Sequence, residues 1–292
     1  MNRHTSAALI CLAAVVWLYS DVLSSLVRQW AGDDNYSHGF FIIPLAVYCG
    51  WQRRELLSRT PTQPHASGLV LILIGLLTFA AGSLAAELFL TRLSIVVVTA
   101  GAILFLWGPA HLKHLAFPLT LLPLMVPLPA LIFNQIAFPL QLVASRLGET
   151  TLAAAGIPVL RDGNVLELPN ITLAVAEACS GIRSLISLIT LAIVLAYFTE
   201  RRPIARVVII ISSVPIAIVA NAFRVAGTGF TSHWLGPRIA EGFFHGFSGW
   251  LVFAVAFAGL LATQRVVRRI PGLAGSSAPS VAMEQKCSPA QS

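Results

Sequence analysis

A thiol, a guanidinium and an imidazole stand beside the ends of three successive apolar segments in the second half of the chain. Cys179 lies in AEACSGIRS, Arg224 in NAFRV and His245 in FFHGFSGW. A cysteine attacks carbonyl carbon as the thiolate, and its free pKa is about 8.5. A helix N-terminus and a neighbouring imidazole both favour the thiolate. These residue types together suit acyl transfer through a thioester.

Each of the three has a distinct role in such a reaction. His245 would take the thiol proton and later return it to a leaving amine. Arg224 stays protonated, so it suits stabilising the oxyanion of a tetrahedral intermediate or holding a substrate carbonyl or carboxylate. Taken singly, each residue also has a structural interpretation. A membrane cysteine is usually a small packing residue, an arginine can extend to the lipid headgroups, and an interfacial histidine can bond a carbonyl.

Four neighbouring residues are candidates for substrate binding or for supporting the site. Arg183, one turn after the cysteine, could instead bind lipid phosphate, and Asn221, one turn before Arg224, could orient it or bridge helices. Ser180 belongs with the small residues that let helices approach closely, as do Gly246 and Gly249 in the histidine motif. His38, in SHGF, opens an earlier apolar segment and could contact substrate or cap a helix.

The sequence predicts no metal site and no cofactor. It contains no HExxH or CxxC spacing, no phosphate-binding glycine loop and no GxSxG nucleophile elbow. His111 and His114 fall at the opposite ends of the apolar segments from the proposed site.

The elements that must position these residues are membrane helices. Of 292 residues, 57% are hydrophobic and 11% are charged, and soluble domains carry about twice that charged fraction. The net charge of +7 comes from short basic clusters between apolar runs, which excludes a nucleic-acid surface and is typical of cytoplasmic loops. We expect an all-α polytopic bundle of about eight transmembrane helices, spanning 6–27, 37–52, 67–85, 88–108, 114–133, 178–198, 205–226 and 243–264.

Two other segments are predicted outside these spans. Residues 134–147 suit a helix lying at the interface, and the β-branched residues around Asp162-Gly163-Asn164 predict a small extramembrane β-hairpin near 155–170. Residues 1–269 then form one integral membrane domain, and 270–292, rich in Pro, Gly, Ser and Ala, a disordered cytoplasmic tail.

The loop charges predict the orientation. With the N-terminus in the cytoplasm, the inner loops hold Arg53, Arg54, Arg59, Lys113, Arg201, Arg202, Arg206, Arg265, Arg268 and Arg269. This excess places both termini inside. It also puts Cys179, Arg224 and His245 at one depth, at the outer leaflet.

The motifs ACSGIRS, NAFRV and FHGFSGW, in that order, resemble the exosortase/archaeosortase family, as do SHGF at 37–40 and VPLPALIFNQIAFPLQ at 126–141. The resemblance covers roughly residues 30–265. It implies a cysteine-type peptidase, or transpeptidase, of a bacterial inner membrane with its active site facing the periplasm. In it, Cys179 matches the proposed nucleophile, Arg224 the family arginine and His245 the third member.

The resemblance also implies the partners. Exosortase substrates are PEP-CTERM proteins, whose C-terminal signal consists of a Pro-Glu-Pro motif, a transmembrane helix and an Arg-rich end, and such sorting accompanies exopolysaccharide production. Membrane lipids are the other expected partner, and the oligomeric state is left open. Two alternatives are a transporter, which should carry broken-helix or charged sites near mid-membrane, and a non-catalytic scaffold in exopolysaccharide assembly.

Overall fold

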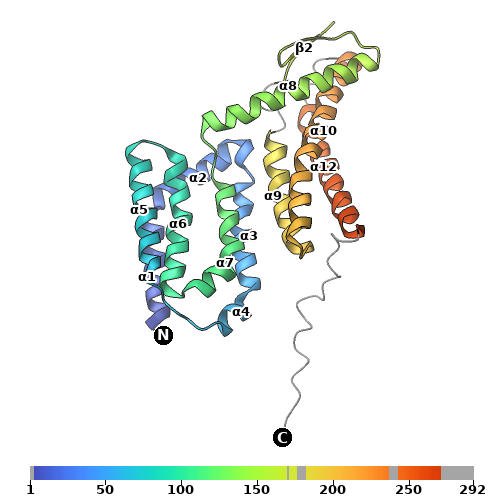
Figure 1. Ribbon diagram of the computed structural model, residues 1–292. Helices are drawn as coiled ribbons and strands as arrows, with labels where there is room; N and C mark the ends of the chain where they lie inside the picture. The colour runs from blue at the N-terminus through green and yellow to red at the C-terminus, as the bar shows by residue number, and fades with distance from the viewer. Residues whose placement is uncertain (1–2, 170, 176–181, 237–242, 271–292) are drawn as a thin grey trace. The chain divides into compact units, whose positions relative to one another are not determined.

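The computed structural model describes residues 3–169, 171–175, 182–236 and 243–270, and for 3–9, 12, 34 and 243–248 only the main chain (Figure 1). Cys179, Ser180 and residues 271–292 of the predicted tail lie outside these ranges. The chain forms two compact units, residues 1–133 and 134–292, each with its own packing.

The predicted helical membrane bundle is confirmed. Six helices in the described part of the chain are long and apolar enough to cross a bilayer: α5 (Ser67–Leu84), α6 (Leu88–Leu106), α8 (Ala130–Ala154), α9 (Ile182–Thr199), α10 (Pro203–Leu235) and residues 249–269 of α12 (Phe243–Arg269). The predicted second span is the shorter apolar helix α3 (Gly39–Gln52), which precedes the short α4 (Arg54–Arg59).

Two predicted spans are broken in the structure. The first consists of α1 (Arg3–Leu18) and α2 (Ser20–Gly32), and the 3₁₀ turn η1 (Asp34–Tyr36) follows. The fifth, predicted at 114–133, is divided among α7 (Pro109–Leu121), the 3₁₀ turn η2 (Leu122–Met125) and the start of α8. Prolines 123, 127 and 129 account for this break, because proline lacks the N–H that an α-helix needs.

The first unit is built around the close pair α5 and α6. Three glycines of α5, at positions 68, 75 and 82, recur every seven residues and are buried against α6. A Cβ added at Gly75 would lie 2.6 Å from Val98 Cγ2, so only glycine permits this approach. Tyr19, at the α1–α2 junction, fastens these helices to α6 through a 2.7 Å hydrogen bond between its hydroxyl and that of Ser94.

The second unit contains the three-helix bundle of α9, α10 and α12. The short connection Glu200–Arg202 joins α9 to α10, so the two helices run antiparallel. Small and branched residues interlock in the core, where Ala192, Ile209 and Leu260 are fully buried.

A buried carboxylate closes one end of this bundle. Glu200 is 4% exposed, and its Oε1 accepts hydrogen bonds from Gln264 Nε2 at 3.0 Å and from Arg268 Nε at 2.9 Å. Arg268 also donates to the Thr199 carbonyl at 2.7 Å, while Arg206 donates to the Glu200 carbonyl at 2.8 Å. These bonds, here called the Glu200 clamp, tie the end of α9, the start of α10 and the end of α12 at one level.

The predicted hairpin is present, with a third strand that the sequence did not predict. Strands β1 (Leu160–Asp162), β2 (Val165–Leu168) and β3 (Ile171–Ala174) form an antiparallel sheet in the order β1-β2-β3. Asp162 pairs with Val165 across the turn at Gly163-Asn164. Gly163 has a φ of +60°, which favours glycine at the first position of a two-residue hairpin turn.

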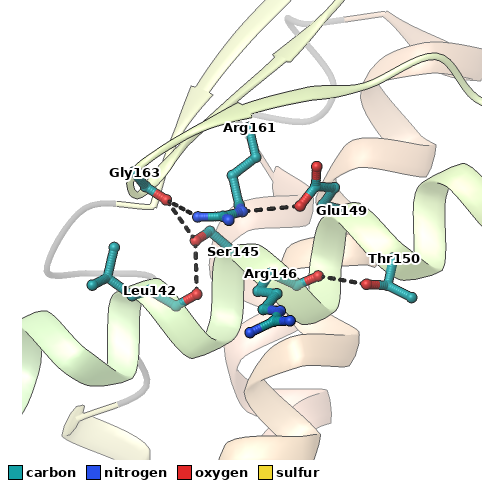
Figure 2. Close-up of polar contacts among 7 residues, drawn as sticks. All are labelled: Leu142, Ser145, Arg146, Glu149, Thr150, Arg161 and Gly163. Atoms are coloured by element: carbon teal, nitrogen blue, oxygen red, sulfur yellow. Dashed lines mark hydrogen bonds and ion pairs between the residues drawn. The ribbon is translucent and has the colours of Figure 1, made fainter.

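The sheet sits on α8 through polar contacts (Figure 2). Ser145 Oγ of α8 donates to the Gly163 carbonyl at 3.0 Å, and Arg161 Nε of β1 pairs with Glu149 at 2.9 Å. Ser145 and Glu149 are one turn apart and share a helix face. The predicted interfacial segment 134–147 is therefore part of a longer helix, one face of which carries the sheet.

The clamp leads to a stability prediction. Replacing the carboxylate in Glu200→Ala removes the acceptor for two side chains, which should lower the free energy of unfolding by about 2–3 kcal/mol. Thermal unfolding of the detergent-purified protein measures this change. Arg269→Ala, which removes an exposed arginine of the same helix turn, is the control and should unfold like the wild type. Equal melting temperatures for both variants would show that the clamp is not needed.

Candidate functional site

Helix lengths counted from the Glu200 clamp show how far along the bundle Arg224 and the start of α9 lie. At 1.5 Å per residue, Arg224 lies about 32 Å along α10 from Pro203, and Ile182 about 26 Å along α9 from Thr199. Because α9 and α10 run antiparallel from the same short connection, Arg224 lies about 6 Å farther from the clamp than Ile182, the first described residue of α9. In the sequence, Cys179 precedes Ile182 by three positions.

The third helix reaches the same level. Counted back from Arg268, Gly249 lies about 29 Å and position 245 about 35 Å along α12, on either side of the level of Arg224. A direct contact agrees with this count, because a Cβ added at Gly249 would be 3.4 Å from Arg224 Nη2. The guanidinium therefore lies against α12 one turn from position 245, and positions 245 and 249 share a helix face.

Arg224 itself is half-buried, and Asn221, one turn before it, is 3% exposed. Both lie within α10, which does not end at 226 as the sequence predicted but continues to Leu235. The fall in hydropathy after 226 marks the edge of the apolar segment, not the end of the helix. Arg224 is thus held by helical backbone on both sides.

The other candidate residues differ in how much of each the structure describes. Cys179 and Ser180 lie outside the described residues, and for His245 the structure describes only the main chain, in the first turn of α12. Arg183 is exposed in the first turn of α9. In the described ranges, the structure holds no group of three or more His, Cys, Asp or Glu side chains that could bind a metal ion. The catalytic roles of the three residues stay predictions.

His38 belongs to the first unit, where its ring holds a loop in place. It is half-buried before the first residue of α3, and its Nε2 lies 3.1 Å from the Leu124 carbonyl. Trp30 Nε1 donates to the neighbouring Met125 carbonyl at 3.0 Å. Trp30 thus joins α2 to η2, and His38 joins the start of α3 to η2. The His38 side chain makes no capping hydrogen bond to α3, so it does not cap the helix as the sequence suggested.

Two residues of the site architecture carried little or no signal in the sequence. The sequence did not point to Glu200. The pattern that could have indicated its role is an acidic residue between the apolar end of α9 and a pair of arginines. Gly249 was expected to allow close helix approach, and the structure shows that the group approaching it is a guanidinium.

These features define a multi-pass helical membrane protein with an arginine held between two helices near one end of a bundle. The family model for transmembrane exosortases matches residues 30–262, which is most of the chain and includes all three predicted catalytic positions. The chain belongs to the transmembrane exosortase family. This membership supports a peptidase-like role in membrane protein sorting. Comparisons with curated proteins and with solved structures gave no match.

The contact at Gly249 leads to a prediction with a matched control. A Cβ added at Gly259, also on α12, would lie 3.4 Å from Ile216 Cγ2. A Cβ added at Gly249 would lie at the same distance from Arg224 Nη2. With the role predicted for Arg224, Gly249→Leu should displace its guanidinium and reduce substrate processing at least about tenfold, since small displacements of groups at a reacting centre are costly. Gly259→Leu should perturb packing to a similar degree but spare processing. Equal processing by the two variants would show that the position of Arg224 does not matter for the reaction.

His38 leads to a pH prediction. Burial lowers the pKa of His38 from its usual 6.5, and the hydrogen bond with Leu124 offsets part of this shift. The unfolded chain then takes up a proton below pH 6.5 more readily than the folded chain, so this contribution to stability is present above pH 6.5 and is lost on acidification. The wild type should therefore lose more of its melting temperature between pH 7.5 and 5.5 than His38→Gln. Equal losses of melting temperature in the wild type and in His38→Gln would contradict this prediction.

Proposed function

We propose that this protein is a membrane-embedded cysteine peptidase that cleaves PEP-CTERM-type sorting signals through a thioester on Cys179. The observation that carries the proposal is the position of Arg224. Its guanidinium lies against α12 one turn from position 245, and Ile182, the first described residue of α9, follows Cys179 by three positions in the sequence. The contact between α10 and α12 supports a site shared by Arg224 and His245, and the sequence adds Cys179 next to the start of the third helix of the same bundle.

The reaction follows from the chemistry of the three groups. His245 takes the proton of the Cys179 thiol, and the sulfur attacks the carbonyl carbon of the scissile peptide bond. Arg224 stabilises the resulting oxyanion. When the intermediate collapses, the C–N bond breaks, His245 protonates the leaving amine, and the thioester remains. Water then releases an acid, or an amine takes the acyl group in a transpeptidation.

The proposed location is the outer face of a bacterial inner membrane, with both termini in the cytoplasm. Its support is the excess of arginine in loops at one side, including the Glu200–Arg206 region beside the clamp. The clamp end of the bundle is then cytoplasmic, and Arg224, about 32 Å along α10, lies near the far side of a hydrocarbon core about 30 Å thick. A substrate helix in the bilayer would present its Pro-Glu-Pro segment at that surface, in keeping with sorting linked to exopolysaccharide export.

A cleavage assay tests this function. A tagged PEP-CTERM substrate is followed in cells carrying the wild type, Cys179→Ala or Cys179→Ser, and both variants should lose processing because neither methyl nor hydroxyl replaces a thiolate. Arg224→Lys should lose most activity as well, since a point charge does not reproduce the planar guanidinium. Cys49→Ala, at a buried cysteine of α3, is the matched control and should process normally.

Membrane levels of every variant are measured alongside. Unchanged processing by Cys179→Ala at normal abundance would make Cys179 a packing residue. The transporter and scaffold alternatives would then be the ones to pursue.

A further inference from the structure

Strand β3 is an edge strand that precedes Cys179 closely in the sequence. It stands last in the sheet order β1-β2-β3, and its final residue, Ala174, precedes the cysteine by five positions. Five extended residues span at most about 17 Å, so anything bound along β3 lies within short reach of the proposed nucleophile.

The register shows which main-chain groups of β3 point outward. The Val175 N–H donates to the Asn164 carbonyl at 2.8 Å, so residue 175 pairs inward, toward β2. Pairing direction alternates along an antiparallel strand, which turns the N–H and C=O groups of Thr172 and Ala174 to the open edge. Both residues are exposed, and within the described residues no other strand pairs with this edge.

The two faces of β3 differ in character. Ile171 and Leu173 are half-buried against the apolar cluster of α8, α10 and the sheet, and Phe230 of α10 packs on the same cluster. Phe230 stacks on Trp234, with ring centroids 5.3 Å apart and an interplanar angle of 17°, and Trp234 is 69% exposed. An apolar surface with an exposed aromatic ring therefore lies on the inner side of the sheet that β3 ends.

We propose that the open edge of β3 binds the substrate's Pro-Glu-Pro segment as a fourth strand; the proposal rests on the function proposed above. In an added strand, alternate residues turn their main-chain groups to β3. If the glutamate lies opposite Thr172, its N–H and C=O pair with that residue, while the two prolines, which have no N–H, face away from the ladder. The spacing of the motif thus avoids both of the hydrogen bonds that proline cannot make.

The same register places the side chains suitably. A residue opposite Thr172 shares its exposed face, so the glutamate side chain lies in water. The prolines lie opposite Ile171 and Leu173 and share their apolar face, on the side of Phe230 and Trp234. Prolines on the free side of the new strand also prevent another chain from adding to it. The edge would hold the signal extended while the following residues reach Cys179.

The first test changes one main-chain donor. Thr172→Pro removes the N–H at the open edge and leaves the β2–β3 ladder intact, because that N–H does not point to β2. Processing at limiting substrate should fall about tenfold, which corresponds to roughly 1.4 kcal/mol of lost binding. Wild-type processing by Thr172→Pro, at normal membrane abundance, would overturn strand addition.

A second measurement keeps the proposal testable if the proline variant is poorly folded. In a chain with all four native cysteines replaced by alanine, single cysteines are introduced by Thr172→Cys or Leu173→Cys, and in the substrate at the glutamate or at a proline. Disulfides should form between Thr172→Cys and the glutamate position, and between Leu173→Cys and a proline position, at least several-fold more than in the crossed pairs. Crosslinking without this alternation would refute the added strand.

The two proposals fail in different ways. Processing that survives Cys179→Ala would end the peptidase proposal whatever the crosslinks show. Processing that depends on Cys179, together with crosslinks that do not alternate, would leave the peptidase intact and remove only strand addition.

Discussion

The buried carboxylate of Glu200 is the constraint on which the bundle of the second unit depends. An ionised group in an apolar interior is stable only when it is paired and hydrogen-bonded. Glu200 meets this need with Gln264 and Arg268, and the surrounding main chain adds bonds to the same helix ends. Because an α-helix rises by a fixed amount per residue, a shared origin at one end fixes which residues of the three helices meet at the other.

That register explains why Arg224 and Gly249 lie together. A guanidinium between helices needs room, and Gly249 supplies it by having no side chain at the point of contact. A Cβ at this position would already touch the guanidinium at 3.4 Å, so a larger side chain would push the charge toward lipid, where an arginine is costly. Gly249 lies about 30 Å along α12 from Arg268, the partner of the Glu200 carboxylate. Both ends of the helix nevertheless determine where Arg224 lies.

The sequence predicted the helical bundle from its long apolar runs and the hairpin from the β-branched residues around Asp162-Gly163-Asn164. It missed features that depend on tertiary partners. Strand β3 is short and pairs only because β2 is beside it, and Glu200 resembles an ordinary loop residue until Gln264 and Arg268 surround it. The end of α10 was placed too early because hydropathy reports the end of the apolar segment, whereas the helix continues beyond it to Leu235.

The extra length of α10 connects the membrane site to the sheet. A helix of 33 residues is about 50 Å long and exceeds a hydrocarbon core of about 30 Å. Near its C-terminal end it crosses α8 closely, since a Cβ at Gly148 would lie 2.7 Å from Val225 Cγ1 and one at Gly229 would lie 2.7 Å from Leu152 Cδ1. Helix α8 in turn carries the sheet through Ser145. One rigid helix thus holds both Arg224 and the support of β3, so a peptide bound at that edge would keep a fixed distance from the arginine without any contribution from flexible loops.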